Sequence, residues 1–324
     1  MFQQVKNIFF RQKRTGDYKA LRHTFFRDPA IANQLHEEGY YIADFLGEQA
    51  KISLIDLYKT YHQLEEKQDG VFFGTFSKDL DYRKIVHDAI NKVLAEAFSK
   101  WFIDYKSIIN NYVIKTPGKS TRVPIHQDGA AIDEEKYSSI NVWIPLQDVT
   151  PLNGALSLIP RSQHIFSPYR CNTTPPLVKN IEQELYPYFL PIYLKPGQVI
   201  FFDSRVFHYS TPNLSATNRV AIVCRICPVK ASIVTYYLEK GKKGASIEVW
   251  SCPEDFLISK VGYNEDMRPS GATLIGYKNV NIEPLTIGEF EEKRRTLGIQ
   301  VQNFFISPPQ LEKQNFILEP INGK

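Results

Sequence analysis

The chain has 324 residues, of which 43% are apolar and 23% charged, a composition typical of a globular protein with a large core. The 39 Lys and Arg residues outnumber the 35 Asp and Glu residues by four, an excess too small to indicate a nucleic-acid-binding protein. The four cysteines exclude a disulfide scaffold. No apolar stretch reaches about 18 residues and no secretion signal is recognisable, so we expect no membrane span and a cytoplasmic location.

Basic residues dominate the N-terminal segment, residues 1–28. Lys6, Arg11, Lys13 and Arg14 lie within it, against the single acidic residue Asp17 before residue 28. We expect a solvated arm that packs along the surface, because runs of like charge are usually solvated. A nucleic-acid-binding arm or an anionic docking patch is the alternative.

Helices are predicted in the segment that follows the arm. Asp28-Pro29 favours a helix start, because Asp caps free N–H groups and Pro fits the first helical position, and Gly39 is placed to end that helix. Residues 40–43 form a short predicted strand. Apolar residues recur at helical spacing over residues 48–66 and again from about Asp79 to Phe102.

After Phe102 the apolar pattern alternates, which predicts strands. Pro-Gly and Asn-Gly pairs separate several of them, and Asn153-Gly154 is a hairpin signal with residues 155–159 as the return strand. A series of short strands favours a sandwich or barrel over alternating β-α units. The other predicted strands cover residues 105–116, 138–146, 198–203 and 219–227.

The strand pattern places one domain over residues 29–230, with two exceptions to its rhythm. Residues 161–195 are long and rich in proline, as in a functional lid, although their aromatic residues can equally form a minor core. The C-terminal extension covers residues 231–324, of which residues 253–324 have weak periodicity apart from a charged helix near 287–297. We expect this C-terminal extension to pack on the same domain.

Two of the seven histidines lie in settings that indicate metal binding. His126-Gln127-Asp128 places an imidazole and a carboxylate two residues apart, and residues i and i+2 of an extended chain point to the same side. His208 follows the predicted strand 198–203. Two histidines and one carboxylate leave three metal positions open, as in non-haem Fe(II) oxygenases. Structural or solvent roles explain the other five: His23, His36, His62, His87 and His164.

An arginine and a serine accompany His208. Arg219 follows it by 11 residues at the start of the next predicted strand, where a buried guanidinium can hold a carboxylate through two hydrogen bonds. Ser210 can add a hydroxyl donor. The alternative for Arg219 is a surface salt bridge. Arg225 has the same strand parity as Arg219, and we expect it at the rim of the barrel, with a second cation of the pocket as the alternative.

These motifs resemble the phytanoyl-CoA dioxygenase family of Fe(II)/2-oxoglutarate oxygenases over about residues 30–230. The family typically has Pro-Gly-Ser-His after its Asn-Gly-Ala-Leu turn, so Arg161 replaces a glycine and Gln163 is an insertion. The segments 197–203 and 37–40 also resemble the family. The motifs are His126-Gln127-Asp128, Asn153-Gly154-Ala155-Leu156 with Pro160-Arg161-Ser162-Gln163-His164, and His208-x-Ser210-x-x-Asn213-x-Ser215-x-x-x-Arg219.

The resemblance implies a mainly β fold with flanking helices, a double-stranded β-helix (jelly-roll, cupin-like) barrel. It implies that His126, Asp128 and His208 hold Fe(II), with 2-oxoglutarate and O2 as cosubstrates. Arg219 would pair with the distal carboxylate of 2-oxoglutarate, helped by Ser210. Trp143 matches an aromatic residue of the cosubstrate pocket, with a place in the barrel core as the alternative.

The sequence therefore predicts a dioxygenase that hydroxylates an unactivated C–H bond of a small molecule, an amino acid or residue in a peptide, or a natural-product intermediate. Asp128 favours hydroxylation over halogenation, because related halogenating enzymes have a small residue there. A zinc hydrolase is one alternative, since two histidines and a carboxylate also bind Zn(II), but it leaves Arg219 without a role. A non-enzymatic binding module on a cupin-like barrel is the other.

Overall fold

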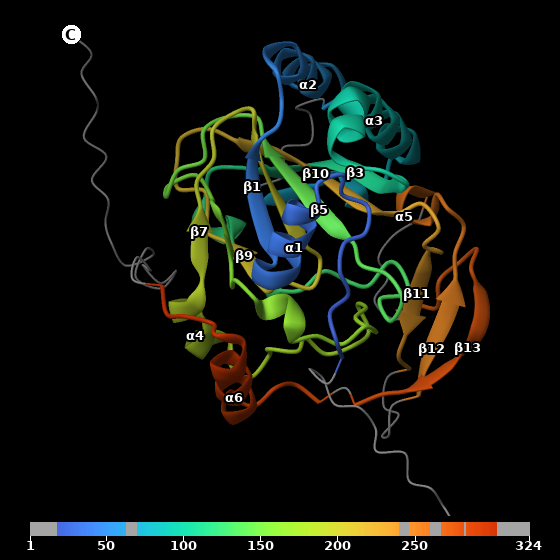
Figure 1. Cartoon of the computed structure of the whole chain (residues 1–324). Coiled ribbons are helices and arrows are strands. Elements are labelled where there is room, and N and C mark those ends of the chain that lie inside the picture. Colours follow the sequence, from blue (N-terminus) through green and yellow to red (C-terminus); the bar gives the residue numbers. More distant parts are fainter. Residues whose placement is uncertain (1–17, 63–69, 240–245, 260–266, 282, 303–324) are drawn as a thin grey trace, which may run out of the picture.

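The computed structural model describes residues 18–62, 70–239, 246–259, 267–281 and 283–302 (Figure 1). Its α-helices are α1 (Pro29–Glu38), α2 (Glu48–Tyr61), α3 (Leu80–Trp101), α4 (Glu182–Leu185), α5 (Phe256–Ser259) and α6 (Ile287–Leu297). Short 3-10 helices cover Gly74–Phe76, Lys119–Thr121, Ser162–His164 and Tyr186–Tyr188. The strands are β1 (Tyr40–Asp44), β2 (Val71–Phe73), β3 (Tyr105–Lys115), β4 (Val123–His126), β5 (Ile140–Pro145), β6 (Leu156–Leu158), β7 (Leu190–Ile192), β8 (Gln198–Asp203), β9 (His208–Ser210), β10 (Arg219–Pro228), β11 (Val234–Tyr237), β12 (Ser246–Ser251) and β13 (Thr273–Asn279).

Two antiparallel sheets form the centre of the protein. One has six strands in the order β1-β8-β5-β10-β3-β2, and the other has four in the order β4-β9-β6-β7. From β3 to β10 the chain passes back and forth between these sheets, which is the connectivity of a jelly roll. The predicted fold class is confirmed, although the sheets remain separate hydrogen-bonded units and do not close into one ring.

Helices α2 and α3 cover one face of the six-stranded sheet, and the other face is left for the site (Figure 1). Successive residues of a strand point to opposite faces, so β10 contributes to both sides. Arg219, Val223 and Arg225 of β10 line an internal cavity. Buried residues of α3 and the alternate residues of β10 share one core cluster: Ile90, Leu94, Phe98, Ile222, Cys224 and Ile226.

The helix ends follow from the capping residues that the sequence shows. The Asp28 carboxylate accepts a hydrogen bond from the Ala30 N–H at 2.8 Å, and Gly39 has a φ of 83°, a left-handed conformation that glycine adopts without strain. The predicted helix over 29–38 is therefore confirmed. The helix expected over 48–66 ends at Tyr61, and residues 63–66 lie outside the described part.

The hairpin expected at Asn153-Gly154 is wrong. Strand β6 pairs with β7 and β9, whereas β5 belongs to the six-stranded sheet, so this turn carries the chain from one sheet to the other. A glycine is still required there, because Gly154 has a φ of 84° and a Cβ atom would lie 2.7 Å from the Lys115 side chain.

The segment 161–195 divides into two parts. Tyr186, Tyr188 and Phe189 pack in a core cluster with Phe290 of α6, so these aromatic residues are core. Residues 167–178 instead line the internal cavity. The lid role predicted for the segment stays a prediction, and it now concerns this second part.

The basic arm lies mostly outside the described residues, which begin at Tyr18. Its described end contradicts the expectation of a surface arm, because His23, Phe25 and Phe26 are each at most 5% exposed. The two phenylalanines stack at 5.4 Å and pack against Phe102. The apolar residues between the basic ones therefore determine where this segment lies.

A buried ionic cluster fastens the same segment to β8. His23 Nε2 lies 3.0 Å from Asp203 Oδ2, and Arg205 Nε donates to Asp203 Oδ1 at 2.8 Å. All three side chains are at most 1% exposed. Burial alone would raise the pKa of Asp203, but Arg205 and His23 outweigh it and hold that pKa well below its usual range.

The C-terminal extension contains a third sheet, in the order β11-β12-β13, which stands beside the jelly roll in Figure 1. Helix α6 spans the predicted Ile287–Leu297, with Thr286 and Glu289 forming a capping box. The division into domains stays a prediction. None of the helices in the described part of the chain is long and apolar enough to cross a membrane.

Replacing Asp203 with asparagine tests the buried cluster. We expect Asp203→Asn to lower the free energy of unfolding by about 3–5 kcal/mol, because it leaves the buried Arg205 without a carboxylate. The contribution of Asp203 is present above the unfolded pKa of about 3.9 and is lost as the pH falls further, since its folded pKa is lowered. Urea denaturation at pH 7 measures the destabilisation, and repeating it at about pH 2 measures the loss of the contribution at low pH.

The exposed pair Lys84–Asp88, with both side chains more than half exposed, provides the control. Asp88→Asn should change the unfolding free energy little, because exposed ion pairs contribute little. An Asp203→Asn variant that is as stable as Asp88→Asn would show that the cluster does not stabilise the fold.

Candidate active site

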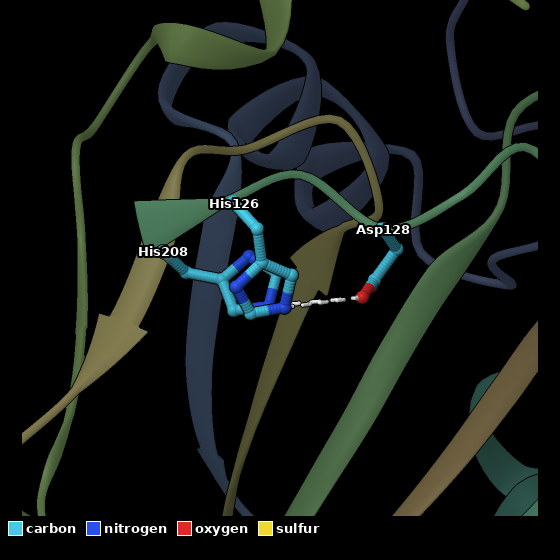
Figure 2. A group of neighbouring side chains, drawn as sticks. All are labelled: His126, Asp128 and His208. Carbon is cyan, nitrogen blue, oxygen red and sulfur yellow. Dashed lines mark ion pairs between the residues drawn. The ribbon is translucent and has the colours of Figure 1, made fainter. Parts of the chain in front are cut away.

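The pairing of β4 with β9 places two histidines side by side. His126 ends β4, His208 begins β9, and the two residues are opposite each other in the antiparallel register. Their ring centroids are 4.1 Å apart. Asp128 follows β4, and its N–H donates to the Ser204 carbonyl at 3.1 Å. The structure therefore brings together the three predicted metal ligands, as Figure 2 shows.

Backbone carbonyls orient both imidazole rings. Nδ1 of His126 lies 2.8 Å from the Pro124 carbonyl, and Nδ1 of His208 lies 3.0 Å from the Val206 carbonyl. A carbonyl only accepts hydrogen bonds, so each Nδ1 carries the proton and each Nε2 presents a lone pair. Burial, followed by the neighbouring His126, lowers the pKa of His208 to about 4, so this ring is neutral at pH 7 and ready to bind a metal.

Asp128 is held as a carboxylate. Burial alone would raise its pKa, but the neighbouring His208, Arg225 and His126, with the hydrogen bond from Asn141, outweigh burial and lower that pKa. The Asn141 amide donates a hydrogen bond to Oδ2, which leaves Oδ1 facing the histidines. Asn141 was not predicted from the sequence, although it lies two residues before Trp143 on the same strand and so on the same face.

The separations of the donor atoms fit one divalent metal ion. Asp128 Oδ1 lies 3.7 Å from His126 Nε2 and 3.8 Å from His208 Nε2, and all three donors lie within 4.8 Å of one another. Donors about 2.1 Å from one ion at ordinary angles lie roughly 3.0–3.5 Å apart, so a small contraction completes the site. Two imidazoles and one carboxylate suit Fe(II) and leave the remaining positions open.

The three ligands border a cavity of about 1000 Å³ between the two sheets. Arg219, Ser210 and Trp143, the other predicted site residues, line the same cavity. Trp143 is 4% exposed and also belongs to a core cluster. It therefore lies both at the cavity and in the barrel core, the two positions that the sequence left open.

Arg219 is a buried cation with no ion-pair partner recorded in the described part of the chain. It is 2% exposed, its Nε and Nη1 atoms have no hydrogen-bond partner among the described residues, and its guanidinium lies 5.3 Å from the Trp143 ring centroid. Burial lowers the pKa of Arg219 to about 10, which leaves it charged at pH 7. An unpaired buried cation is costly, so this geometry suits an anionic ligand.

A second ionic cluster holds the loop that carries Asp128. The Glu134 side chain is fully buried and accepts two hydrogen bonds from Arg170, at 2.7 and 2.9 Å. Arg170 Nε donates to the Asp128 carbonyl at 2.8 Å, and the Arg170 carbonyl accepts from the Ala130 N–H at 2.8 Å. The segment 167–178 is thereby attached directly to the metal-binding loop.

Arg225 completes this cluster and does not lie at a solvent-exposed rim. It is 8% exposed, donates to the Gly129 carbonyl at 2.8 Å and lies 3.9 Å from Glu134. Its strand parity was the one signal in the sequence. The sequence contains no signal for the role of Glu134. This residue belongs to the charged segment Asp133-Glu134-Glu135-Lys136, and such segments are usually solvated.

His164 and Arg161 have structural roles. His164 Nε2 lies 2.9 Å from the His36 carbonyl, away from the metal ligands. Arg161 has a φ of 67°, in the left-handed region that favours glycine, which explains why a glycine is typical at this position of the motif. Its guanidinium pairs with Glu38, an interaction that offsets the backbone strain.

Comparisons with known proteins agree with these motifs. The phytanoyl-CoA dioxygenase (PhyH) family model matches residues 26–221. The phytanoyl-CoA dioxygenase domain-containing protein 1 homolog of Dictyostelium discoideum is 27% identical over 208 residues, 52% of this chain and 74% of that protein. Phytanoyl-CoA dioxygenase of Arabidopsis thaliana is 32% identical over 117 residues, which cover 34% of this chain and 40% of the plant protein.

Solved structures show a more distant likeness. The non-heme alpha ketoglutarate dependent epimerase SnoN from nogalamycin biosynthesis has a TM-score of 0.47 and 14% identity, over 81% of this chain and 98% of its own. The corresponding carbocyclase SnoK has a TM-score of 0.45 and 18% identity, over 64% of this chain and 85% of its own.

Glu134→Gln tests the cluster behind the metal-binding loop. We expect metal affinity to fall about 10- to 100-fold, as is typical when a group that supports metal ligands is removed. The physical reason is that Arg170 and Arg225 lose their carboxylate and hold the loop less firmly. Calorimetric titration with Mn(II) measures the affinity.

Glu135→Gln is the matched control, because Glu135 is the next residue and pairs with Lys278 near the surface. Its metal affinity should equal that of the unmodified protein. Equal affinities for the two variants would remove Glu134 from the support of the metal-binding loop.

Proposed function

Because the chain belongs to the phytanoyl-CoA dioxygenase family, we propose that it hydroxylates a C–H bond of a small organic molecule, with Fe(II) held by His126, Asp128 and His208. The match to the family model confirms the family that the motifs predicted. It also confirms the predicted enzyme class, an oxygenase that depends on Fe(II) and 2-oxoglutarate. The reaction outcome, the substrate and the role of each residue belong to the proposal.

One observation carries the proposal. Three metal-binding side chains and an unpartnered, buried arginine face one cavity of about 1000 Å³. The metal ligands supply a site for Fe(II), and Arg219 supplies the charge that a dicarboxylate needs. A cavity of this size has room for a cosubstrate and a second organic molecule.

Bound Fe(II) supplies the oxidation, in which O2 and 2-oxoglutarate yield succinate, CO2 and one oxygen atom for the substrate C–H bond. The protein binds, orients and shields the reactants. Val206 and Pro124 fix the histidine rings through their carbonyls, and Asn141 fixes Asp128. Residues 167–178 line the cavity and help to exclude water from it.

Arg219 would bind the distal carboxylate of 2-oxoglutarate. A guanidinium can donate two parallel hydrogen bonds to a carboxylate, and the Nε and Nη1 atoms of Arg219 have no partner among the described residues. Ser210 lies two residues after His208 on β9 and lines the same cavity, so its hydroxyl can add a third. Trp143 packs under the guanidinium and limits its movement.

Succinate release separates this proposal from its alternatives. Purified protein with Fe(II), ascorbate and 2-oxoglutarate should produce succinate, more so when a substrate is present. A zinc hydrolase or a binding module would produce none. Absence of succinate from protein that is fully loaded with Fe(II) would contradict the proposal.

Asp128→Ala should abolish succinate release without unfolding the protein. The variant loses one of three metal ligands and the negative charge that balances the metal. The fold should persist, because its core consists of apolar clusters that do not include the metal ligands. Succinate release with Fe(II) in excess and the melting temperature of the metal-free protein are the two measurements.

Full activity in this variant would exclude Asp128 as a ligand. A metal-free variant that no longer folds would instead identify Asp128 as a structural carboxylate.

Arg219→Ala should raise the 2-oxoglutarate concentration needed for half-maximal succinate release roughly 100-fold, because a buried, hydrogen-bonded ion pair is lost. Mn(II) affinity in the absence of 2-oxoglutarate should change little. Arg268→Ala is the control, since Arg268 also lines the cavity but pairs with Glu248. An unchanged requirement for 2-oxoglutarate would exclude Arg219 from the cosubstrate site.

A further inference from the structure

The C-terminal sheet forms part of the wall of the cavity. Val234, Tyr236 and Tyr237 of β11 line it together with residues 267–271, which precede β13. All of these residues lie beyond the segment that matches the family, residues 26–221. This wall is therefore a feature of the chain outside its family domain.

Hydrogen bonds fix the wall relative to the metal-binding loop. The Val234 N–H donates to the Ala131 carbonyl at 3.1 Å, three residues after Asp128. The Leu238 N–H donates to the Thr173 hydroxyl at 2.7 Å, within the segment 167–178. These hydrogen bonds hold the wall, the metal-binding loop and the segment 167–178 in fixed positions around the space where a substrate would bind.

The charged side chains that line the cavity in the described residues are already paired, apart from Arg219. Arg170 pairs with Glu134, and Arg268 pairs with Glu248 at 2.8 Å. Arg225 donates to Gly129 and lies 3.9 Å from Glu134. Glu182 lies 3.7 Å from Arg122. With Arg219 assigned to 2-oxoglutarate, these side chains leave no free charge for an ionic group of the substrate.

Asn111 is one of two polar side chains lining this cavity whose buried amide oxygen has no hydrogen-bond partner among the described residues; the other is Gln127, which stands between His126 and Asp128. Asn111 is 7% exposed and lines the cavity from β3, yet its Oδ1 has no hydrogen-bond partner among the described residues. Leaving a buried acceptor without a donor is costly. Val223 lies between Asn111 and Trp143 in the register, which separates Asn111 from Trp143 by roughly 10 Å.

The orientation of the Asn111 amide is determined by its other contact. Nδ2 donates to the Val223 carbonyl at 3.2 Å, so the amide cannot be reversed without placing two oxygens together. The free group is therefore an acceptor. It cannot bind a carboxylate of 2-oxoglutarate, which is also an acceptor at neutral pH, and it requires an O–H or N–H donor.

We propose that Asn111 recognises a hydroxyl or amide N–H of the substrate, and that the part of the substrate inside the cavity is uncharged and mainly apolar. The uncharged character of the substrate rests on the proposed function, because it assumes that Arg219 binds 2-oxoglutarate. The role of Asn111 rests only on its unpartnered oxygen in this cavity. Apolar walls from β11 would contact the body of the substrate, and Asn111 would fix its orientation relative to the metal.

Binding of matched probes tests the proposal without turnover. Each probe set has one apolar body, such as decalin, biphenyl or an eight-carbon chain, carrying a primary alcohol, its methyl ether or a carboxylate. Dissociation constants are measured by ligand-observed NMR on protein with Zn(II) and N-oxalylglycine, which occupies the cosubstrate position. The alcohols should bind roughly 10-fold more tightly than their ethers, because only they can donate to Asn111.

Asn111→Leu should reduce that preference to less than about 2-fold while leaving N-oxalylglycine and Mn(II) binding unchanged. Asn111→Ala is a second variant if the leucine does not fold. Asn281→Leu is the matched control, since Asn281 lines the same cavity but its Oδ1 already accepts from the Glu283 N–H. It should keep the preference for the alcohols.

Four results would overturn the proposal. These are equal binding of alcohol and ether, a preference that survives in Asn111→Leu, tighter binding of the carboxylates, and no binding of any probe. Failure of the proposed function looks different. In that case N-oxalylglycine would not bind and succinate would not form, while the comparison of alcohol with ether would still report on Asn111.

Discussion

The antiparallel pairing of β4 with β9 is the constraint on which the site depends. It sets His126 opposite His208, although 81 residues lie between them in the chain. Both strands are short, so the pairing needs support from neighbouring elements, and β6 supplies it by pairing with the other side of β9. The metal ligands therefore depend on the four-stranded sheet as a whole, not on a single local motif.

Two clusters of buried charge lie close to this pairing. One contains Asp203, Arg205 and His23, and the other contains Glu134, Arg170 and Arg225. Each cluster contains a fully buried carboxylate, and each contacts a segment that carries a metal ligand. Such clusters are poor sources of stability in themselves, because removing charges from water is costly. Their position suggests that they specify the arrangement of the loops.

Local signals allowed accurate prediction where local chemistry determines the structure. Asp28 and Gly39 gave the ends of α1, and alternation gave β8 and β10, because capping and periodicity depend on near neighbours. The hairpin at Asn153-Gly154 failed because the same turn signal serves a crossing between sheets. Glu134 and Arg170 could not be predicted, since 36 residues separate them and only the folded chain brings them together.

The metal ligands were predictable for a different reason. Their spacing is recognisable through resemblance, whereas their geometry follows from a sheet whose pairing the sequence does not display. Asn111 had neither signal, because it belongs to no motif and its orphaned oxygen exists only once Nδ2 has bound Val223. Residues that define a reaction class can thus be found by pattern, while residues that select a substrate emerge from what the fold leaves unpaired. In this cavity the fold leaves Arg219 and the amide oxygens of Asn111 and Gln127 without hydrogen-bond partners among the described residues, and of these we have proposed Arg219 for the cosubstrate and Asn111 for a second molecule.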